Sequence, residues 1–267
     1  MTTPTRLQGV EALEQMFTQA NSEGRAAFLP YFPIGYPNYE DSVAAIEAMA
    51  EVGVDGFEIG IPFSDPLADG PTIQEATQIA LKNGTTVQHC LDAVQTLRAK
   101  GINQPMMLMG YANPLIAYGI DRFVKAAKDA GADGLIVPDV PPEEAGMFAD
   151  ICKQEGLALI FFLAPTSNDK RMELVAENAS GFIYVLSLVG ITGAREALAS
   201  DLQEFIARIR TKTDTPLVLG FGISKPEHVR DLHGLVNGFI VGSALVRAGA
   251  ASVDHVKALA KSLRDAI

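Results

Sequence analysis

The sequence predicts an α/β protein, a closed (β/α)8 barrel preceded by one extra helix. The chain has 267 residues, a length at which such barrels commonly form a single domain. Eight short apolar runs alternate with amphipathic helical patterns. Parallel strands that helices cover on both faces appear in a sequence as continuous apolar runs of this kind. We therefore expect one barrel domain over residues 1–267.

The eight β/α units follow one another in a regular order. Four segments share one pattern, in which a helix ends, small or polar residues turn at a Gly, and an apolar run begins: 51–62, 129–140, 177–188 and 233–245. Strands are predicted near 28–32, 56–61, 106–110, 134–138, 158–163, 181–187, 216–220 and 238–241. Helices are predicted near 6–21, 42–52, 72–82, 86–100, 120–130, 143–155, 169–178, 195–211, 226–233 and 252–265.

An open, doubly wound sheet is the alternative fold. The glycine-rich dinucleotide fingerprint is missing after the first predicted strand, where residues 31–35 are YFPIG. In a barrel, function lies at the C-terminal ends of the strands. The segments 62–71 and 188–195, after strands two and six, are longer than the usual connection and belong to that side.

Composition excludes several classes of protein. A net charge of −11 argues against binding a nucleic acid backbone, and no apolar run is long enough to span a membrane. The N-terminus has no secretory pattern, and two cysteines form neither a disulfide framework nor a metal cluster, so we expect a soluble cytoplasmic protein. The four histidines do not cluster, and all fall in helical patterns on the far side from the strand ends.

Glu58 is the strongest catalytic candidate. Alternation along a strand puts Glu58 and Gly60 on one face and Phe57, Ile59 and Ile61 on the other, so Glu58 points into the barrel lumen beneath a residue without a side chain. A buried carboxylate has a raised pKa, which suits a general acid or base near neutral pH. The alternative is a carboxylate paired with an internal Arg or Lys, but the neighbouring strands offer no obvious basic residue.

Two more acids follow on the long loop after strand two. Asp69 could reach back over the mouth of the barrel, or it could cap the helix that follows Gly70 and Pro71. Spacing alone leaves these two roles about even. Asp65, between Ser64 and Pro66, is a better turn or cap candidate than Asp69.

Glycine-rich turns follow strands seven and eight, at residues 220–224 and at Gly242 and Ser243. In phosphate-binding barrels these two loops, with a short helix that can begin here at Ser243, hold the phosphate through backbone N–H groups. Residues 187–195 are typical of a lid, since two glycines can absorb a backbone change and Thr192 offers a hydroxyl.

Together these residues resemble the tryptophan synthase alpha subunit family over nearly the whole chain. The most specific match is the pattern E-x-G-x-P-F-S-D-P-x-A-D-G-P at residues 58–71. Further matches are GYP at 35–37, MGYANP at 109–114, PDVP at 138–141, GITG at 190–193, GFGIS at 220–224 and GS at 242–243. This chain has Leu188 at a lid position where some members have arginine.

The resemblance implies reversible retro-aldol cleavage of indole-3-glycerol phosphate to indole and glyceraldehyde 3-phosphate, without a metal or organic cofactor. Glu58 matches the acid and base, and Asp69 matches the carboxylate that accepts the indole N–H. Tyr184 matches an active-site tyrosine, although a core aromatic residue would fit the same alternation. Thr192 matches a lid threonine that closes on Asp69. The residues that match the phosphate site are Gly193, Gly222, Gly242 and Ser243.

The resemblance also implies a partner. Alpha chains of the family pair with a beta subunit in an α2β2 complex, where pyridoxal phosphate on the beta subunit joins indole to serine. Asp65 would then be a charged contact for that partner. A stand-alone lyase and a non-catalytic activating subunit are the alternatives, and the presence of both Glu58 and Asp69 counts against the second.

Overall fold

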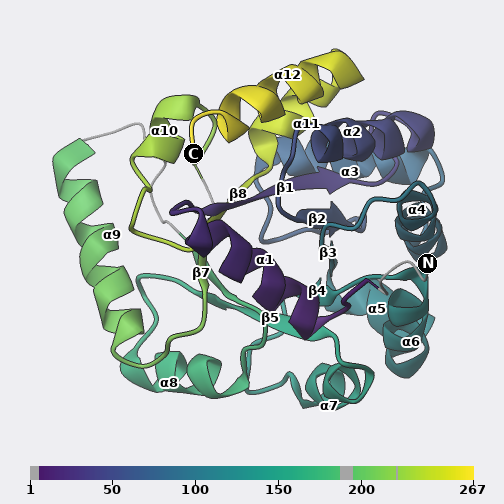
Figure 1. Cartoon of the computed structure of the whole chain (residues 1–267). Coiled ribbons are helices and arrows are strands. Elements are labelled where there is room, and N and C mark those ends of the chain that lie inside the picture. Colours follow the sequence, from purple (N-terminus) through teal and green to yellow (C-terminus); the bar gives the residue numbers. More distant parts are fainter. Residues whose placement is uncertain (1–5, 187–194, 221) are drawn as a thin grey trace, which may run out of the picture.

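Eight parallel strands close into a barrel in chain order, and β1 pairs with both β2 and β8 (Figure 1). The structure is a computed structural model, and it describes residues 6–186, 195–220 and 222–267. The strands are β1 Ala27–Pro33, β2 Phe57–Gly60, β3 Met106–Met109, β4 Gly134–Ile136, β5 Ala158–Leu163, β6 Ile183–Leu186, β7 Leu217–Gly220 and β8 Gly238–Val241. The predicted (β/α)8 barrel is confirmed, and each predicted strand lies within two residues of an observed one.

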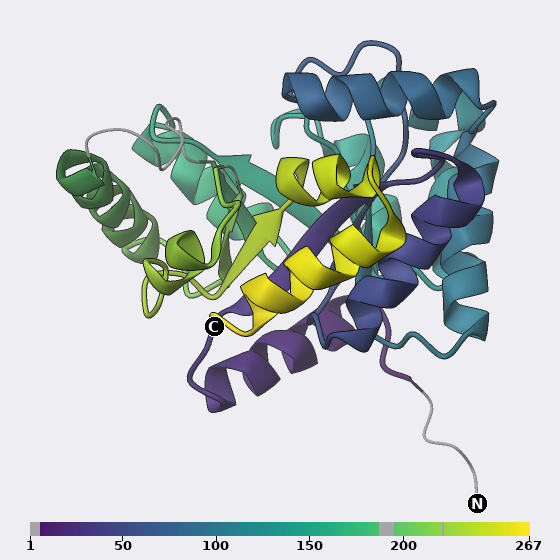
Figure 2. The ribbon, with the colours of Figure 1, turned by 90° about the horizontal axis from the view of Figure 1, so that it is seen from above.

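Helices follow the strands and surround the barrel (Figures 1 and 2). They are α1 Val10–Ser22, α2 Tyr39–Glu51, α3 Pro71–Lys82, α4 Val87–Ala99, α5 Ala112–Tyr118, α6 Ile120–Ala130, α7 Gly146–Glu155, α8 Asp169–Asn178, α9 Arg195–Arg210, α10 Pro226–Arg230, α11 Ser243–Gly249 and α12 Val253–Arg264. In the described part of the chain, no helix combines the length and the apolar character needed to cross a membrane.

One helix was not predicted, and four predicted helices differ from the observed ones by three or four residues at one end: 6–21 against Val10–Ser22, 42–52 against Tyr39–Glu51, 143–155 against Gly146–Glu155 and 226–233 against Pro226–Arg230. Helix α5 was not predicted, because Asn113 and Pro114 are typical of a turn; Pro114 is tolerated because it lies in the first turn, where its missing N–H would have no intrahelical partner. Helix α10 ends at Arg230 instead of continuing to residue 233. The chain turns after it, and Gly234 adopts a φ of 72°.

The extra helix α1 covers the N-terminal end of the barrel. The side chain of Leu13 lies beside Gly181, the sulfur of Met16 lies beside Gly56, and Phe17 contacts Phe182 with ring centroids 6.0 Å apart. These partners precede strands β6 and β2, so α1 closes the barrel at the end opposite to the long loop after β2. This arrangement leaves the C-terminal ends of the strands as the open side.

A buried ion cluster stabilises the same N-terminal end. The carboxylate of Asp133 is fully buried, and it accepts from Arg6 at 3.0 Å and from Arg98 at 2.7 Å. It also accepts from the backbone N–H groups of Gly9 and Met106, both at 2.9 Å. All of these donors converge on one carboxylate, which ties the segment before α1 to the start of β3 and to helix α4.

Candidate active site

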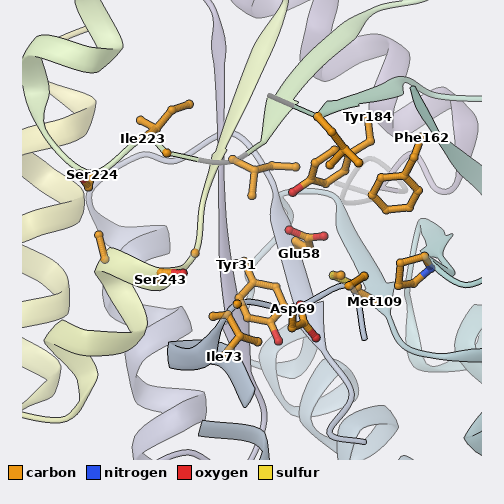
Figure 3. Close-up of a pocket in the computed structure, with 18 of the residues that line it drawn as sticks. Tyr31, Glu58, Asp69, Ile73, Met109, Phe162, Tyr184, Ile223, Ser224 and Ser243 are labelled. Carbon is orange, nitrogen blue, oxygen red and sulfur yellow. The ribbon is translucent and has the colours of Figure 1, made fainter. Parts of the chain in front are cut away.

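A cavity of about 440 Å³ opens at the C-terminal ends of the strands. This volume is typical of a small-molecule site. Figure 3 shows Glu58 near its centre, with Tyr184 and Phe162 to one side and Ser243 and Ser224 to the other. The described lining residues come from all eight strands or the segments that follow them, which agrees with the rule for barrel sites.

Glu58 lies in the lumen, as strand alternation predicts. In β2 it stands beside Tyr31 of β1 and Met107 of β3. Its exposed fraction is 1 %, and within the described residues its Oε1 has no hydrogen-bond partner. The ion-pair alternative is therefore wrong for the part of the chain that the structure describes. Burial, and then the nearby charge of Asp69, raise the pKa of Glu58 to about 8.

Gly60 is needed because of Tyr31, a residue that the sequence did not single out. A Cβ at position 60 would lie 2.4 Å from the hydroxyl oxygen of Tyr31, so only glycine leaves room for this ring beside Glu58. Tyr31 is 6 % exposed, and its pKa is raised well above the ordinary value by burial and by the charges of Asp69 and Glu58. Alternation along the first strand, combined with its pairing to the second, was the signal that could have found it.

Asp69 faces the cavity and does not cap the next helix. The N-cap of α3 is Gly70, and no side chain caps it. Instead, the hydroxyl of Tyr111 donates to Oδ2 of Asp69 at 3.0 Å and accepts from the backbone N–H of Ala68 at 3.0 Å. Burial raises the pKa of Asp69 to about 6, although the bond from Tyr111 lowers it. Tyr111 thus positions the loop and its acid, a role that spacing could not predict.

Aromatic rings form one wall of the cavity. Tyr184 points into the lumen, as alternation predicts, and its ring lies 4.7 Å from that of Phe162, centroid to centroid. Gly220 makes room for Tyr184, since a Cβ there would lie 2.1 Å from the ring. Burial raises the pKa of Tyr184 well above its ordinary value, so its hydroxyl stays neutral. A flat aromatic ligand could pack against this wall.

The predicted phosphate residues Gly222, Gly242 and Ser243 all line the cavity. The prediction that all four histidines lie on the far side from the strand ends was wrong for His228. Its Nδ1 accepts from the backbone N–H of Ser224 at 3.3 Å and lies 3.2 Å from the carbonyl oxygen of Gly222. His228 therefore shapes the turn after β7 that lines the cavity.

The remaining predicted residues do not line the cavity or cannot be placed. Asp65 is exposed on the loop after β2, outside the described lining. Its neighbour Leu67 is 92 % exposed. Thr192 and Gly193, like Leu188, fall outside the described residues.

Comparisons with known proteins agree with this geometry. The sequence model of one family, tryptophan synthase alpha chain, matches residues 17–266. The tryptophan synthase alpha chain of Chloroflexus aggregans is 46 % identical over 252 residues, which cover 94 % of this chain and 92 % of that one. The tryptophan synthase of Saccharomyces cerevisiae is 44 % identical over 88 % of this chain, but only 34 % of that longer protein is matched. A solved structure of Mycobacterium tuberculosis tryptophan synthase has a TM-score of 0.89 and 36 % identity, covering 96 % of this chain and 97 % of that one.

Proposed function

Because the chain belongs to the tryptophan synthase alpha chain family, its reaction is the alpha reaction, and we propose that Glu58 and Asp69 carry it out. The enzyme is a carbon–carbon lyase of tryptophan biosynthesis, and it cleaves indole-3-glycerol phosphate to indole and glyceraldehyde 3-phosphate. The residue assignment rests on the buried carboxyl of Glu58, which faces the same cavity as Asp69 and has one oxygen without a hydrogen-bond partner among the described residues.

Glu58 acts first as an acid. With a pKa of about 8 it holds a proton at neutral pH, and it gives that proton to C3 of the indole ring. The ring becomes a cation, and its N–H donates to Asp69, which is ionised at neutral pH because its pKa is about 6. The negative charge of Asp69 stabilises the developing positive charge.

Glu58 then acts as a base. Its carboxylate removes the proton from the hydroxyl on the glycerol carbon attached to C3. The oxygen forms the aldehyde carbonyl, the bond between C3 and that carbon breaks, and its electron pair returns to the ring to restore neutral indole. The proton ends on Glu58, so the enzyme is ready for another turnover. None of these steps uses a metal or an organic cofactor.

We propose one orientation for the substrate in the cavity. The indole ring packs between the aromatic wall of Tyr184 and Phe162 and the acids, while the phosphate lies toward Gly222, Gly242 and Ser243. We propose that Gly193 completes the phosphate site and that Thr192 closes over Asp69. The Ser243→Asp variant places a negative charge beside the phosphate, so KM should rise while kcat changes less. An unchanged KM would count against this placement of the phosphate.

Family membership implies a beta subunit as the partner. We propose an α2β2 complex in the cytoplasm, in which only the beta subunit holds pyridoxal phosphate. The proposed docking contact is the loop that carries Asp65, supported by the exposure of the apolar side chain of Leu67 on the same loop. The yeast relative, which extends well beyond the matched region, is consistent with an alpha unit that works beside another unit.

Indole release by the purified chain, alone and with a tryptophan synthase beta subunit, tests the function. A large stimulation by the partner supports the subunit role. Fast turnover by the chain alone would favour a stand-alone lyase, and no indole in either case would refute the assignment.

A further inference from the structure

The cavity has an unusual balance of charge for a site that receives a phosphate ester. Two acids, Glu58 and Asp69, line it, and the chain as a whole carries a net charge of −11. At neutral pH Glu58 is protonated and Asp69 is ionised, so a substrate phosphate with up to two negative charges is repelled by Asp69 and by the net charge of the chain. Among the lining residues that the structure describes, Arg247 is the one that carries a permanent positive charge.

Arg247 lies on the phosphate side of the cavity. It belongs to α11, four residues after Ser243, and residues four apart lie on the same face of a helix. Both residues line the cavity. The side chain of Arg247 is exposed, so it stands at the rim, where it can meet an incoming ligand.

A contact between helices orients the Arg247 guanidinium. Its Nη1 donates to the hydroxyl oxygen of Thr72 on α3 at 3.2 Å, and α11 packs against α3. A guanidinium has five N–H donors, so this single bond leaves others for a ligand. In the part of the chain that the structure describes, no carboxylate forms an ion pair with Arg247, and its charge is not neutralised there.

We propose that Arg247 is a binding residue for the phosphate of the substrate, adding a charged side chain to the backbone groups of the glycine turns. The proposal rests on the proposed function and assigns the recognition of one end of the substrate. Guanidinium groups bind phosphate oxygens through paired N–H bonds, and at an exposed rim solvent screens part of this attraction. The contact is present before and during the reaction, so it acts on binding more than on the chemical step.

The reverse reaction allows binding of the two ends of the substrate to be measured separately, because indole has no phosphate whereas glyceraldehyde 3-phosphate has one. In the Arg247→Gln variant, KM for glyceraldehyde 3-phosphate should rise about five- to tenfold. KM for indole and kcat should stay within about twofold of the wild type. The inhibition constant of inorganic phosphate should rise in parallel, and Arg247→Lys should recover part of the loss because it keeps the charge.

Two variants provide controls. Lys125→Gln removes an exposed positive charge on α6, away from the lining residues, and should leave both KM values unchanged. Thr72→Val removes the bond that orients Arg247 but keeps the guanidinium charge, so its effect should be smaller than that of Arg247→Gln.

Equal increases in KM for indole and for glyceraldehyde 3-phosphate, or no increase in either, would overturn the assignment. A Thr72→Val effect as large as that of Arg247→Gln would also overturn it, since Arg247 would then act only by holding two helices together. None of these outcomes affects the proposed function, which fails if the wild type releases no indole with or without a beta subunit, or if Glu58→Gln keeps a near-normal rate.

Discussion

Replacing Glu58 with glutamine should nearly abolish indole formation and at the same time stabilise the folded protein. Glutamine keeps the shape of the side chain but cannot exchange a proton in the relevant range. Positioned proton transfer is typically worth 10²–10⁴-fold in rate, so indole release should fall by about that factor. The barrel should remain folded, since the variant fills the same space.

The stability change follows from the pKa of Glu58. The folded protein keeps the carboxyl proton of Glu58 up to about pH 8, whereas the ordinary pKa of this side chain, which applies to the unfolded chain, is 4.5. Between these two pH values the unfolded chain loses the proton first, so the free energy of unfolding falls as pH rises. At about 1.4 kcal/mol per pKa unit, the buried acid costs roughly 3 kcal/mol at pH 7 and roughly 5 kcal/mol above pH 8.

Glutamine is neutral at every pH and avoids this cost. One polar atom of its amide takes the place of Oε1, which has no partner among the described residues, and an unsatisfied buried group costs about 1–3 kcal/mol; the net gain of Glu58→Gln should therefore be small at pH 6 and largest above pH 8. Urea unfolding at pH 6, 7, 8 and 9 measures the difference between the two proteins. Glu14→Gln on α1, which removes an exposed carboxylate at the other end of the barrel, is the matched control.

Two results would refute the reasoning. If the wild type and Glu58→Gln show parallel pH dependence of stability, Glu58 is not a buried acid with a raised pKa. If the variant keeps a near-normal rate of indole release, Glu58 is not the proton donor.

Three further outcomes are expected. In Asp69→Asn, kcat/KM should fall by about 10²-fold or more. The alkaline limb of its pH profile should also move below about pH 8, because the charge of Asp69 raises the pKa of Glu58 in the wild type. An alkaline limb at an unchanged pH would argue against this coupling. In Tyr111→Phe, the acid limb should move above about pH 6, because the wild-type hydrogen bond from Tyr111 lowers the pKa of Asp69 and its loss raises that pKa. Measuring kcat/KM at several pH values locates the acid limb. In Asp133→Asn, the free energy of unfolding measured in urea should fall by about 3–5 kcal/mol, since Arg6 and Arg98 lose their anionic partner. KM of the folded enzyme should stay near normal. A small change in the free energy of unfolding would mean that water compensates for the lost carboxylate.

Local sequence patterns were sufficient to predict the strands and the position of Glu58. The eight apolar runs and their spacing predicted the barrel, because strands covered on both faces must be apolar throughout. Alternation with a period of two placed Glu58 in the lumen, because successive side chains on a strand point to opposite faces. Patterns failed where a residue is compatible with two local structures, as at Asn113 and Pro114, which suit both a turn and the first turn of α5.

Tertiary structure decided which distant residues meet. The sequence left Asp69 open between a helix cap and a cavity residue. The hydroxyl of Tyr111, 42 positions away, holds its carboxylate in the cavity lining. The register between β1 and β2 sets Tyr31 beside Glu58, and the packing of α11 on α3 brings Arg247 to Thr72 across 175 positions. Periodicity reports which face of its own element a residue occupies. It carries no information on strand register or helix packing, and these determine the neighbours of each side chain in the cavity.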